Sequence, residues 1–434
     1  MASCDVSADH KKLDSFLVKE NIFNPHLPRV TWAELTWNDA SDGEVREGVP
    51  RSLGAGLQAS VFSMHYCKSS TSIVKKVAVK IYSFGDLGVD NTGKPAKRKA
   101  LNAKNLRKMA DPLIRECAVF SAMSNRSNFV LHSLGVGTVP EIPRLGIGPA
   151  AFIVMEMAEM SLWSKERNTF TDDVSCLFNC LDSCPATVSL KDASSTMKLL
   201  WLCELAIGLR DLHALGGVLH RDFTVDNILL ARSFSDSETE QSHQGDGGNG
   251  KTLSETVTLM RQKLRKQHLS DETDMLLSLE PRISDFGVSK LFLDKGSAVR
   301  GAMRNYPPEG IDYQHYKKVL NTLQSDAARN SEDKSWETDL DAKHIYSPAA
   351  DVWSFGHIIH DIIVSTPYRV DLSKSEVIQD HVLENKMDFS HVKFVFPEVI
   401  DVMRECFRYD IAQRLTSALL ATQLIEILQK LCET

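Results

Sequence analysis

Strand-like patterns fill the first part of the chain, and helix-like patterns fill the second. The runs SLGAGLQASVFSMHY, SIVKKVAVKIYSF and AAFIVMEMA are short and rich in apolar and β-branched residues, as is typical of strands. Farther along, STMKLLWLCELAIGLRDLHALG and ADVWSFGHIIHDIIVS repeat apolar residues at helical spacing. A β-rich part followed by a helical part predicts an α+β fold with two unequal lobes, the smaller one β-rich and the larger one mainly α-helical.

Changes in composition divide the 434 residues into predicted domains. The first 28 residues are polar and form either a flexible arm or a short helix. We predict an N-terminal extension over residues 1–49, a small lobe with its connection over 50–158, and a large lobe over 159–432. Polar stretches interrupt the large lobe near residues 164–194, 232–280 and 317–345.

The middle one of these stretches combines two kinds of sequence. Its segment SFSDSETEQSHQGDGGNGK is poor in apolar residues and rich in serine, glycine and acids, which favours disorder. The segment that follows places Val257, Met260 and Leu264 at helical spacing. We therefore expect a helix with one apolar face inside an otherwise polar insert.

Charge and apolar content limit the classes of partner and the location. The net charge is −7 and the isoelectric point is about 6.1, so there is no general attraction to nucleic acid or to anionic membranes. No run of 18 or more apolar residues is present, so we expect no membrane span. Nine cysteines without the spacing of a disulfide framework indicate reduced thiols and an intracellular, cytoplasmic protein. The basic run between Lys94 and Lys108 is either a nuclear address or a solvated surface, so a nuclear location stays open.

Four short motifs contain the residues that could carry chemistry. The first holds Gly54 and Gly56 between two strand-like runs, where backbone amides could face phosphate oxygens or simply form a hairpin turn. The second is Lys80 in the apolar run VAVKIY, where a buried ammonium is costly unless it meets an anion. Glu116, in the helical pattern that follows, is a suitable partner. The alternative is that Lys80 reaches solvent at the end of its strand.

The third and fourth motifs are HRDFTVDN and ISDFG. Asp222, Asn227 and Asp285 offer oxygen atoms of the kind that Mg²⁺ prefers when it bridges phosphates. A carboxylate such as Asp222 can also accept a proton from an attacking hydroxyl. Each motif alone could be a charged turn, but all four in this order indicate a site for phosphate transfer.

This ordered set resembles the signature of the eukaryotic protein kinase family. The resemblance spans roughly residues 50–430 and also includes GLRDLHALGGVLHRD, YPPEGI, DVWSFG and CFRYDIAQRL. It implies a bilobal fold that binds ATP between its lobes, with Mg²⁺ as the second cofactor. By this resemblance Lys80 would hold the ATP phosphates and pair with Glu116. Asp285 and Asn227 would bind Mg²⁺, and Asp222 would orient the substrate hydroxyl.

The same resemblance implies positions around the adenine ring and a buried ion pair. Met155 matches the gatekeeper position, and Glu309 and Arg414 match the ion pair that fixes the end of the activation segment. The other residues expected to bind ATP are Gly54, Gly56, Val61, Ala78, Glu156, Ala158 and Leu229.

Thr224 departs from the family pattern. In Ser/Thr-specific members a lysine stands here, and tyrosine kinases place an arginine nearby, but FTVDN has neither. Loss of one preorganised group typically slows a reaction by roughly 10²–10³-fold without abolishing it. We therefore interpret the chain as an active but atypical kinase for Ser/Thr residues of protein substrates in intracellular signalling, loosely nearest the tyrosine-kinase-like branch. The alternatives are a catalytically impaired pseudokinase scaffold and a tyrosine or dual-specificity kinase, and the oligomeric state stays open.

Overall fold

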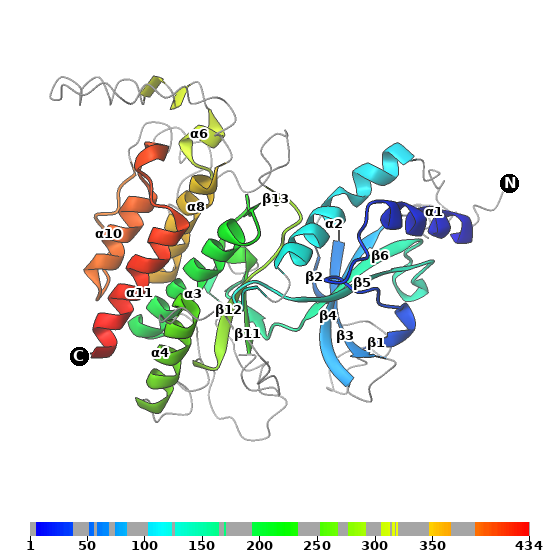
Figure 1. The fold of residues 1–434 in the computed structure, drawn as a ribbon, viewed down its shortest axis with the longest axis horizontal. Coiled ribbons are helices and arrows are strands. Elements are labelled where there is room, and N and C mark those ends of the chain that lie inside the picture. The colour runs from blue at the N-terminus through cyan, green and yellow to red at the C-terminus, as the bar shows by residue number, and fades with distance from the viewer. Residues whose placement is uncertain are drawn as a thin grey trace. The chain divides into compact units, whose positions relative to one another are not determined.

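The chain contains both helices and antiparallel sheet and divides into two compact units (Figure 1). Unit 1 comprises residues 1–127, 131–158 and 285–287, and unit 2 comprises residues 128–130, 159–284 and 288–434. The computed structural model describes residues 6–37, 52–55, 59–68, 74–84, 103–123, 126–164, 169–170, 193–232, 252–267, 277–291, 305–312, 315–316, 318–319, 347–365 and 387–433. The mixed α and β content agrees with the predicted fold class, whereas the bilobal arrangement and the domain boundaries stay predictions.

Unit 1 is built on a six-stranded antiparallel sheet. The strand order is β1-β3-β4-β6-β5, and β2 also pairs with β3. The strands are β1 (Leu35–Trp37), β2 (Ser52–Ala55), β3 (Ala59–Cys67), β4 (Val74–Ser83), β5 (Ser133–Val139) and β6 (Ala150–Glu156). Short 3-10 turns, η1 (Trp32–Glu34) and η2 (Pro143–Leu145), precede β1 and follow β5.

Strand alternation decides which side chains of β4 enter the core of unit 1. Val77, Val79 and Ile81 pack in one apolar cluster with Phe62 and Phe152. Because successive side chains point to opposite faces of a sheet, Lys80 and its neighbours two residues away lie on the other face. The polar motif residue of this strand therefore stands apart from the apolar cluster.

The polar N-terminal residues are an integral part of unit 1. Residues Val6–Lys19 form helix α1, the second of the two alternatives expected for this segment, and Leu13 and Leu17 are fully buried. Val30 then donates a backbone hydrogen bond to the Val136 oxygen of β5 at 2.9 Å. A Cβ added at Gly137 would lie 2.2 Å from the Val30 carbonyl oxygen, so glycine is required for this close approach.

Replacing Leu17 with alanine should lower the free energy of unfolding by about 3–5 kcal/mol, because the side chain is fully buried and leaves a cavity. Val18, its neighbour on α1, is 55% exposed and provides the matched control. Val18→Ala should change the stability by less than about 1 kcal/mol. Urea unfolding of both variants tests the packing of α1, and equal midpoints would contradict it.

Helix α3 (Ser195–Ala214) is the central helix of unit 2, and it contacts α8, α11 and α4. Its residues 197–209 are all buried, as expected for a helix surrounded by other elements. The other helices are α4 (Leu253–Gln267), α6 (Pro308–Ile311), α8 (Pro348–Val364), α10 (Pro397–Cys406) and α11 (Ser417–Glu433), with the 3-10 turn η10 (Ile411–Gln413).

Helix α4 confirms the helix expected within the insert at 232–280. Val257 and Leu264 are buried, and the guanidinium of Arg261 is bidentate on Glu204 of α3 at 2.8 and 2.5 Å. Arg261 also donates to the Leu279 carbonyl oxygen at 3.0 Å. This helix is therefore packed within unit 2 by a buried ion pair with α3 and by an apolar face. Most of the remainder of the three predicted polar stretches lies outside the described residues.

Short strands in unit 2 bring two of the motifs together. In the antiparallel pair β11 and β12, Ile228 lies opposite Ile283, so the residues just before β11 and just after β12 are neighbours. The paired strands β10 and β13 flank the same two loops. The strands are β7 (Met160–Ser161), β8 (Trp163–Ser164), β9 (Thr169–Phe170), β10 (Val218–Leu219), β11 (Ile228–Arg232), β12 (Leu279–Ile283) and β13 (Lys290–Leu291), and the 3-10 turn η5 (Val225–Asn227) precedes β11.

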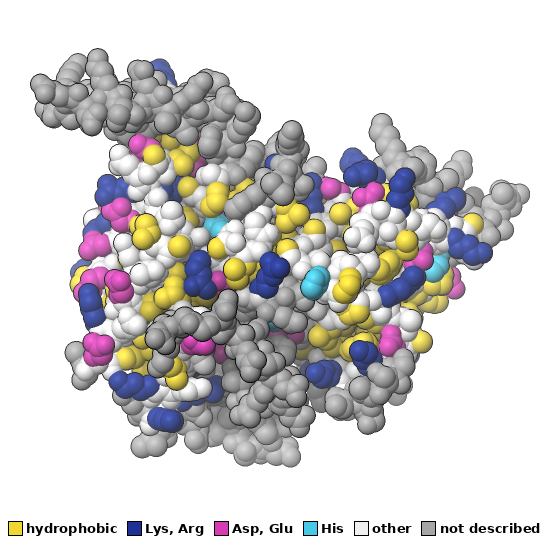
Figure 2. All heavy atoms as spheres, viewed as in Figure 1, with side chains coloured by type: hydrophobic (Ala, Val, Ile, Leu, Met, Phe, Trp, Pro, Cys, Tyr) yellow, Lys and Arg dark blue, Asp and Glu magenta, His cyan; other side chains and the backbone are white. Residues whose placement is uncertain are grey.

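The described surface is mixed in charge. On the face drawn in Figure 2, lysine and arginine side chains are interspersed with aspartate and glutamate side chains. None of the helices in the described part of the chain has the length and apolarity needed to cross a membrane. The described cysteines are all free thiols: Cys67, Cys117, Cys203, Cys406 and Cys432.

Candidate active site

Asp351 of α8 fixes the loop that carries the HRDFTVDN motif. Its carboxylate is 2% exposed and accepts hydrogen bonds from the backbone N–H groups of His220 (2.8 Å) and Arg221 (2.9 Å). The ring of His213 contributes a third contact at 3.0 Å. Burial alone would raise the pKa of Asp351, but these hydrogen bonds and the nearby His213 lower it below its ordinary value. A buried carboxylate thus sets the path of the loop, in which Arg221 has a left-handed φ of 69°.

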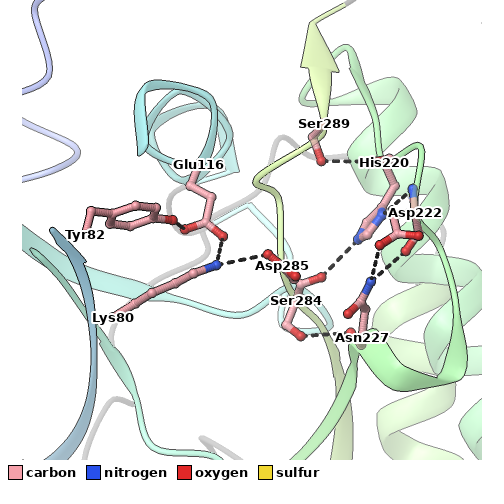
Figure 3. Close-up of polar contacts among 9 residues, drawn as sticks. All are labelled: Lys80, Tyr82, Glu116, His220, Asp222, Asn227, Ser284, Asp285 and Ser289. Atoms are coloured by element: carbon pink, nitrogen blue, oxygen red, sulfur yellow. Dashed lines mark hydrogen bonds and ion pairs between the residues drawn. The ribbon is translucent and has the colours of Figure 1, made fainter. Parts of the chain in front are cut away.

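Asn227 fixes the carboxylate of Asp222. The Asn227 amide nitrogen donates to the Asp222 backbone oxygen at 2.8 Å and to its Oδ2 at 3.2 Å (Figure 3). The amide nitrogen of Asn227 therefore faces Asp222, and its amide oxygen, which can only accept, points elsewhere. Asp222 and Asn227, five residues apart in the sequence, therefore form one preorganised pair.

Ser284, the residue before Asp285, joins the two motif loops. Its backbone N–H and its hydroxyl both donate to the Asn227 carbonyl oxygen, at 2.9 and 2.8 Å. The ring of His220 contacts the Ser284 carbonyl oxygen at 3.0 Å, and the ring is fully buried. These bonds tie the HRDFTVDN and ISDFG segments together, as the register of β11 and β12 requires.

Unit 1 brings Lys80, Glu116 and Asp285 together. The Lys80 ammonium donates to Glu116 Oε1 at 2.6 Å and to Asp285 Oδ1 at 2.9 Å (Figure 3). The expected contact between Lys80 of β4 and Glu116 of α2 (Ala103–Met123) is therefore present. The alternative, in which Lys80 reaches solvent, is wrong because the side chain is only 16% exposed.

The charges in this cluster depend on one another. Burial alone would lower the pKa of Lys80, but the carboxylates of Glu116 and Asp285 raise it above its ordinary value, so the ammonium is charged at neutral pH. The backbone of Asp285 has a left-handed φ of 62°. The next residue, Phe286, is fully buried and packs edge-to-face on Phe120 of α2, with ring centroids 5.6 Å apart. The aromatic contact anchors the segment that carries Asp285.

Three of the residues expected around adenine share one face of the unit 1 sheet with Lys80. Val61 lies directly opposite Lys80, and Met155 directly opposite Ala78. Directly opposed residues point to the same face, and Ala78 and Lys80 are two positions apart. All four side chains therefore lie on one side of the sheet.

The remaining predicted positions have different surroundings. Glu156 ends β6, and its carboxylate accepts from the His132 N–H at 2.8 Å. Gly54 pairs with Val61 at an irregularity in the β2–β3 register, and Gly56 lies outside the described residues. Ala158 is the last residue of the second segment of unit 1, and Leu229 lies on β11 of unit 2.

Glu309 and Arg414 form the expected buried ion pair in unit 2. Arg414 is bidentate on the carboxylate at 2.7 and 3.2 Å, and both side chains are fully buried. Arg414 also donates to the Ala349 carbonyl oxygen, and its guanidinium lies 4.9 Å from the centre of the Trp353 ring. The pair therefore connects α6, α8 and the turn η10.

Two comparisons with known proteins bear on this arrangement. A family model described as protein tyrosine and serine/threonine kinase matches residues 336–424, a segment that includes Asp351 and Arg414. The match covers only part of the chain, and it supports membership in the protein kinase family. The comparison with curated proteins gave no match. The matched segment follows the residues predicted to bind ATP, so the roles proposed for those residues rest on the site geometry and the motifs.

Sequence reasoning missed several residues of this site. Asp351 is part of the quoted run DVWSFG, but nothing in the run indicates that its carboxylate fixes a loop 130 residues earlier. Tyr82 was also missed, although strand alternation from Lys80 was a signal that could have found it. In the described part of the chain, no group of three or more His, Cys, Asp or Glu could hold a metal ion.

Proposed function

We propose that this member of the protein kinase family transfers the γ-phosphate of ATP to serine and threonine hydroxyls of protein substrates. The observation that carries the proposal is the ammonium of Lys80 held between Glu116 and Asp285. Asp222, fixed by Asn227, supports it from unit 2. Phosphoryl transfer needs positioning and neutralised charge more than covalent chemistry from the protein, and these groups supply both.

Each charged group has a role in this proposal. Lys80 provides a positive charge for the phosphate oxygens of ATP, and Glu116 keeps the ammonium in position. Asp222 accepts a hydrogen bond from the substrate hydroxyl and orients it toward the γ-phosphate. The face of the sheet that carries Val61 and Ala78 offers an apolar surface for adenine.

Asp285 and Asn227 are the residues that would hold Mg²⁺. The Asp285 side chain is 52% exposed, and the amide nitrogen of Asn227 donates hydrogen bonds to Asp222. The carboxylate of Asp285 and the amide oxygen of Asn227 are oxygen ligands of the kind that a hard cation takes. This donor set fits Mg²⁺, which usually takes only one or two protein carboxylates and completes its shell with water and phosphate oxygens. When bound, Mg²⁺ neutralises the charge of the phosphate oxygens.

Apolar side chains from β3, β4 and β6 support an adenine-binding role. Val61, Ala78 and Met155 share a face with Lys80 by their cross-strand register. The backbone of Glu156 and Ala158 would then offer hydrogen bonds to the adenine edge, and Leu229 would contribute a further apolar contact. Comparing the affinities for ATP and GTP tests this placement of the base. Measuring the affinity for ATP in the variant Ala78→Trp tests it as well.

Thr224, which stands where a charged donor is expected, should lower kcat for phosphate transfer. Its side chain is 7% exposed, and its carbonyl oxygen accepts from the Asn227 N–H at 3.0 Å. Replacing Thr224 with lysine should raise kcat by roughly 10- to 100-fold, since a preorganised charged donor near the reacting phosphate is typically worth up to about 10³. Thr224→Ala, which adds no charge, should stay within about threefold of the natural chain.

Steady-state transfer from Mg-ATP to one protein substrate measures this effect. A Thr224→Lys chain that folds normally and transfers no faster would contradict the role given to this position. Transfer detected only in Thr224→Lys would favour the pseudokinase scaffold as the state of the natural chain.

The acceptor amino acid is tested separately from activity. We propose Ser/Thr specificity and a role in intracellular signalling in the cytoplasm. A peptide library with serine, threonine or tyrosine as the sole acceptor decides the first point. Phosphorylation of the tyrosine library at an equal or higher rate would overturn Ser/Thr specificity and favour the tyrosine or dual-specificity alternative.

A further inference from the structure

Tyr82 contacts the second oxygen of the Glu116 carboxylate. The tyrosine hydroxyl donates a hydrogen bond to Glu116 Oε2, while Lys80 occupies Oε1 at 2.6 Å (Figure 3). Lys80 and Tyr82 are two residues apart on β4, so they lie on the same face of the strand. The two side chains of this strand therefore hydrogen-bond to the Glu116 carboxylate, each at a different oxygen.

This contact is buried on both sides. Tyr82 is 2% exposed and Glu116 is 1% exposed. Water is therefore not at hand to replace a lost hydrogen bond, and a buried carboxylate with one unsatisfied oxygen is costly. The contact consequently favours one orientation of Glu116, the one in which Oε1 faces the ammonium of Lys80.

Charged and titratable groups surround Glu116 from β4, from α2 and from the Asp285 segment. Burial raises the pKa of Glu116, and Lys80 and the hydrogen bond from Tyr82 oppose that rise, while Asp285 adds to it. Burial, followed by the Glu116 carboxylate, raises the pKa of Tyr82 well above its ordinary value. The tyrosine therefore keeps its proton, so it is the donor and Glu116 the acceptor. Cys117, the next residue on α2, is also buried, and burial likewise raises its pKa.

We propose that Tyr82 is a positioning residue for the phosphate-binding lysine, acting through Glu116. Its hydroxyl holds the carboxylate in place, so that Lys80 stays directed at the phosphates of ATP instead of following a mobile partner. This inference rests on the proposed function, because Lys80 is the group that would touch ATP.

The hydroxyl can be separated from the ring by the substitution Tyr82→Phe. The ring also packs in the cluster, with the Lys80 ammonium 5.7 Å from its centre, and phenylalanine keeps that packing. We expect kcat/KM for ATP to fall about tenfold, the size typical of a hydrogen bond to a charged group. The KM for the protein acceptor should not change. Tyr66→Phe is the matched control, since Tyr66 lies opposite Lys75 in the same hairpin, and it should behave like the natural chain.

A double-mutant cycle distinguishes positioning from general stability. In a Glu116→Ala background, Tyr82→Phe should cost no more than about twofold, because its only proposed route of action is gone. An unchanged kcat/KM in Tyr82→Phe alone, or a full additional loss in the double variant, would overturn the proposal.

Failure of the proposed function is recognised independently. If the natural chain transfers no phosphate, the same cycle is run on the dissociation constant of ATP. Coupling between Tyr82 and Glu116 in that constant would support the positioning role in a scaffold that only binds nucleotide. Additive effects, or no ATP binding at all, would overturn it.

Discussion

Replacing Asp285 with asparagine should lower kcat for phosphate transfer by about 10³-fold or more. The substitution removes the charge that the account assigns to Mg²⁺ binding, and a bound metal contributes several kcal/mol to charge stabilisation in such reactions. It also removes one of the two anions that contact Lys80. The measurement is kcat over a range of Mg²⁺ concentrations, and we expect only partial recovery at high Mg²⁺.

The fold should survive this change. The Asp285 side chain is 52% exposed, and asparagine has the same shape, so the unfolding midpoint should stay close to that of the natural chain. Asp401→Asn on α10, at a side chain that is 71% exposed, controls for the loss of a carboxylate elsewhere. An Asp285→Asn chain that keeps more than about a tenth of the activity would contradict the role of this residue.

The second large effect concerns stability. Replacing Arg414 with methionine should lower the free energy of unfolding by about 3–5 kcal/mol, because it leaves the fully buried carboxylate of Glu309 without its partner. The loss of the contacts with the Ala349 oxygen and the Trp353 ring adds to this effect. Thermal or urea unfolding of the two chains measures this loss of stability.

Two further variants test whether burial of the Glu309–Arg414 pair causes this loss of stability. Arg404→Met breaks an exposed ion pair with Asp401, whose partners are 55% and 71% exposed, and should cost less than about 1 kcal/mol. Replacing both partners, in Glu309→Leu with Arg414→Met, should recover much of the lost stability, since no buried charge is left alone. If Arg414→Met and Arg404→Met were equally stable, burial of the pair would not be the reason for its contribution.

The sequence was informative where function depends on a short run of residues. The motif HRDFTVDN placed Asp222 and Asn227 in one predicted site, and the amide of Asn227 does bond to Asp222. A lysine on an apolar strand needs a buried anion, which correctly led to Glu116. The apolar face of α4 was also readable, because helical periodicity depends only on local spacing.

Contacts between segments far apart in the chain could not be predicted from the sequence. Tyr82 is one aromatic residue among many in strands, and only the path of α2 places Glu116 at its hydroxyl. Arg261 occurs in a charged, helical stretch that reads as a solvated surface, yet its partner Glu204 lies 57 residues away on the central helix. The packing of α1 on β5 is a further case, because a polar N-terminal sequence does not specify the surface that its few leucines bury.

Transfer of labelled γ-phosphate from Mg-ATP by the purified chain, onto itself and onto a mixed protein substrate, measures the proposed kinase activity directly. An Asp222→Asn variant is run beside it, because Asn227 can still bond to the backbone oxygen of that residue while the carboxylate is gone. We expect incorporation by the natural chain and none above background by the variant. Equal incorporation by both would assign the activity to something other than this site. No incorporation by either, with ATP still bound, would contradict the account and leave the chain a nucleotide-binding scaffold.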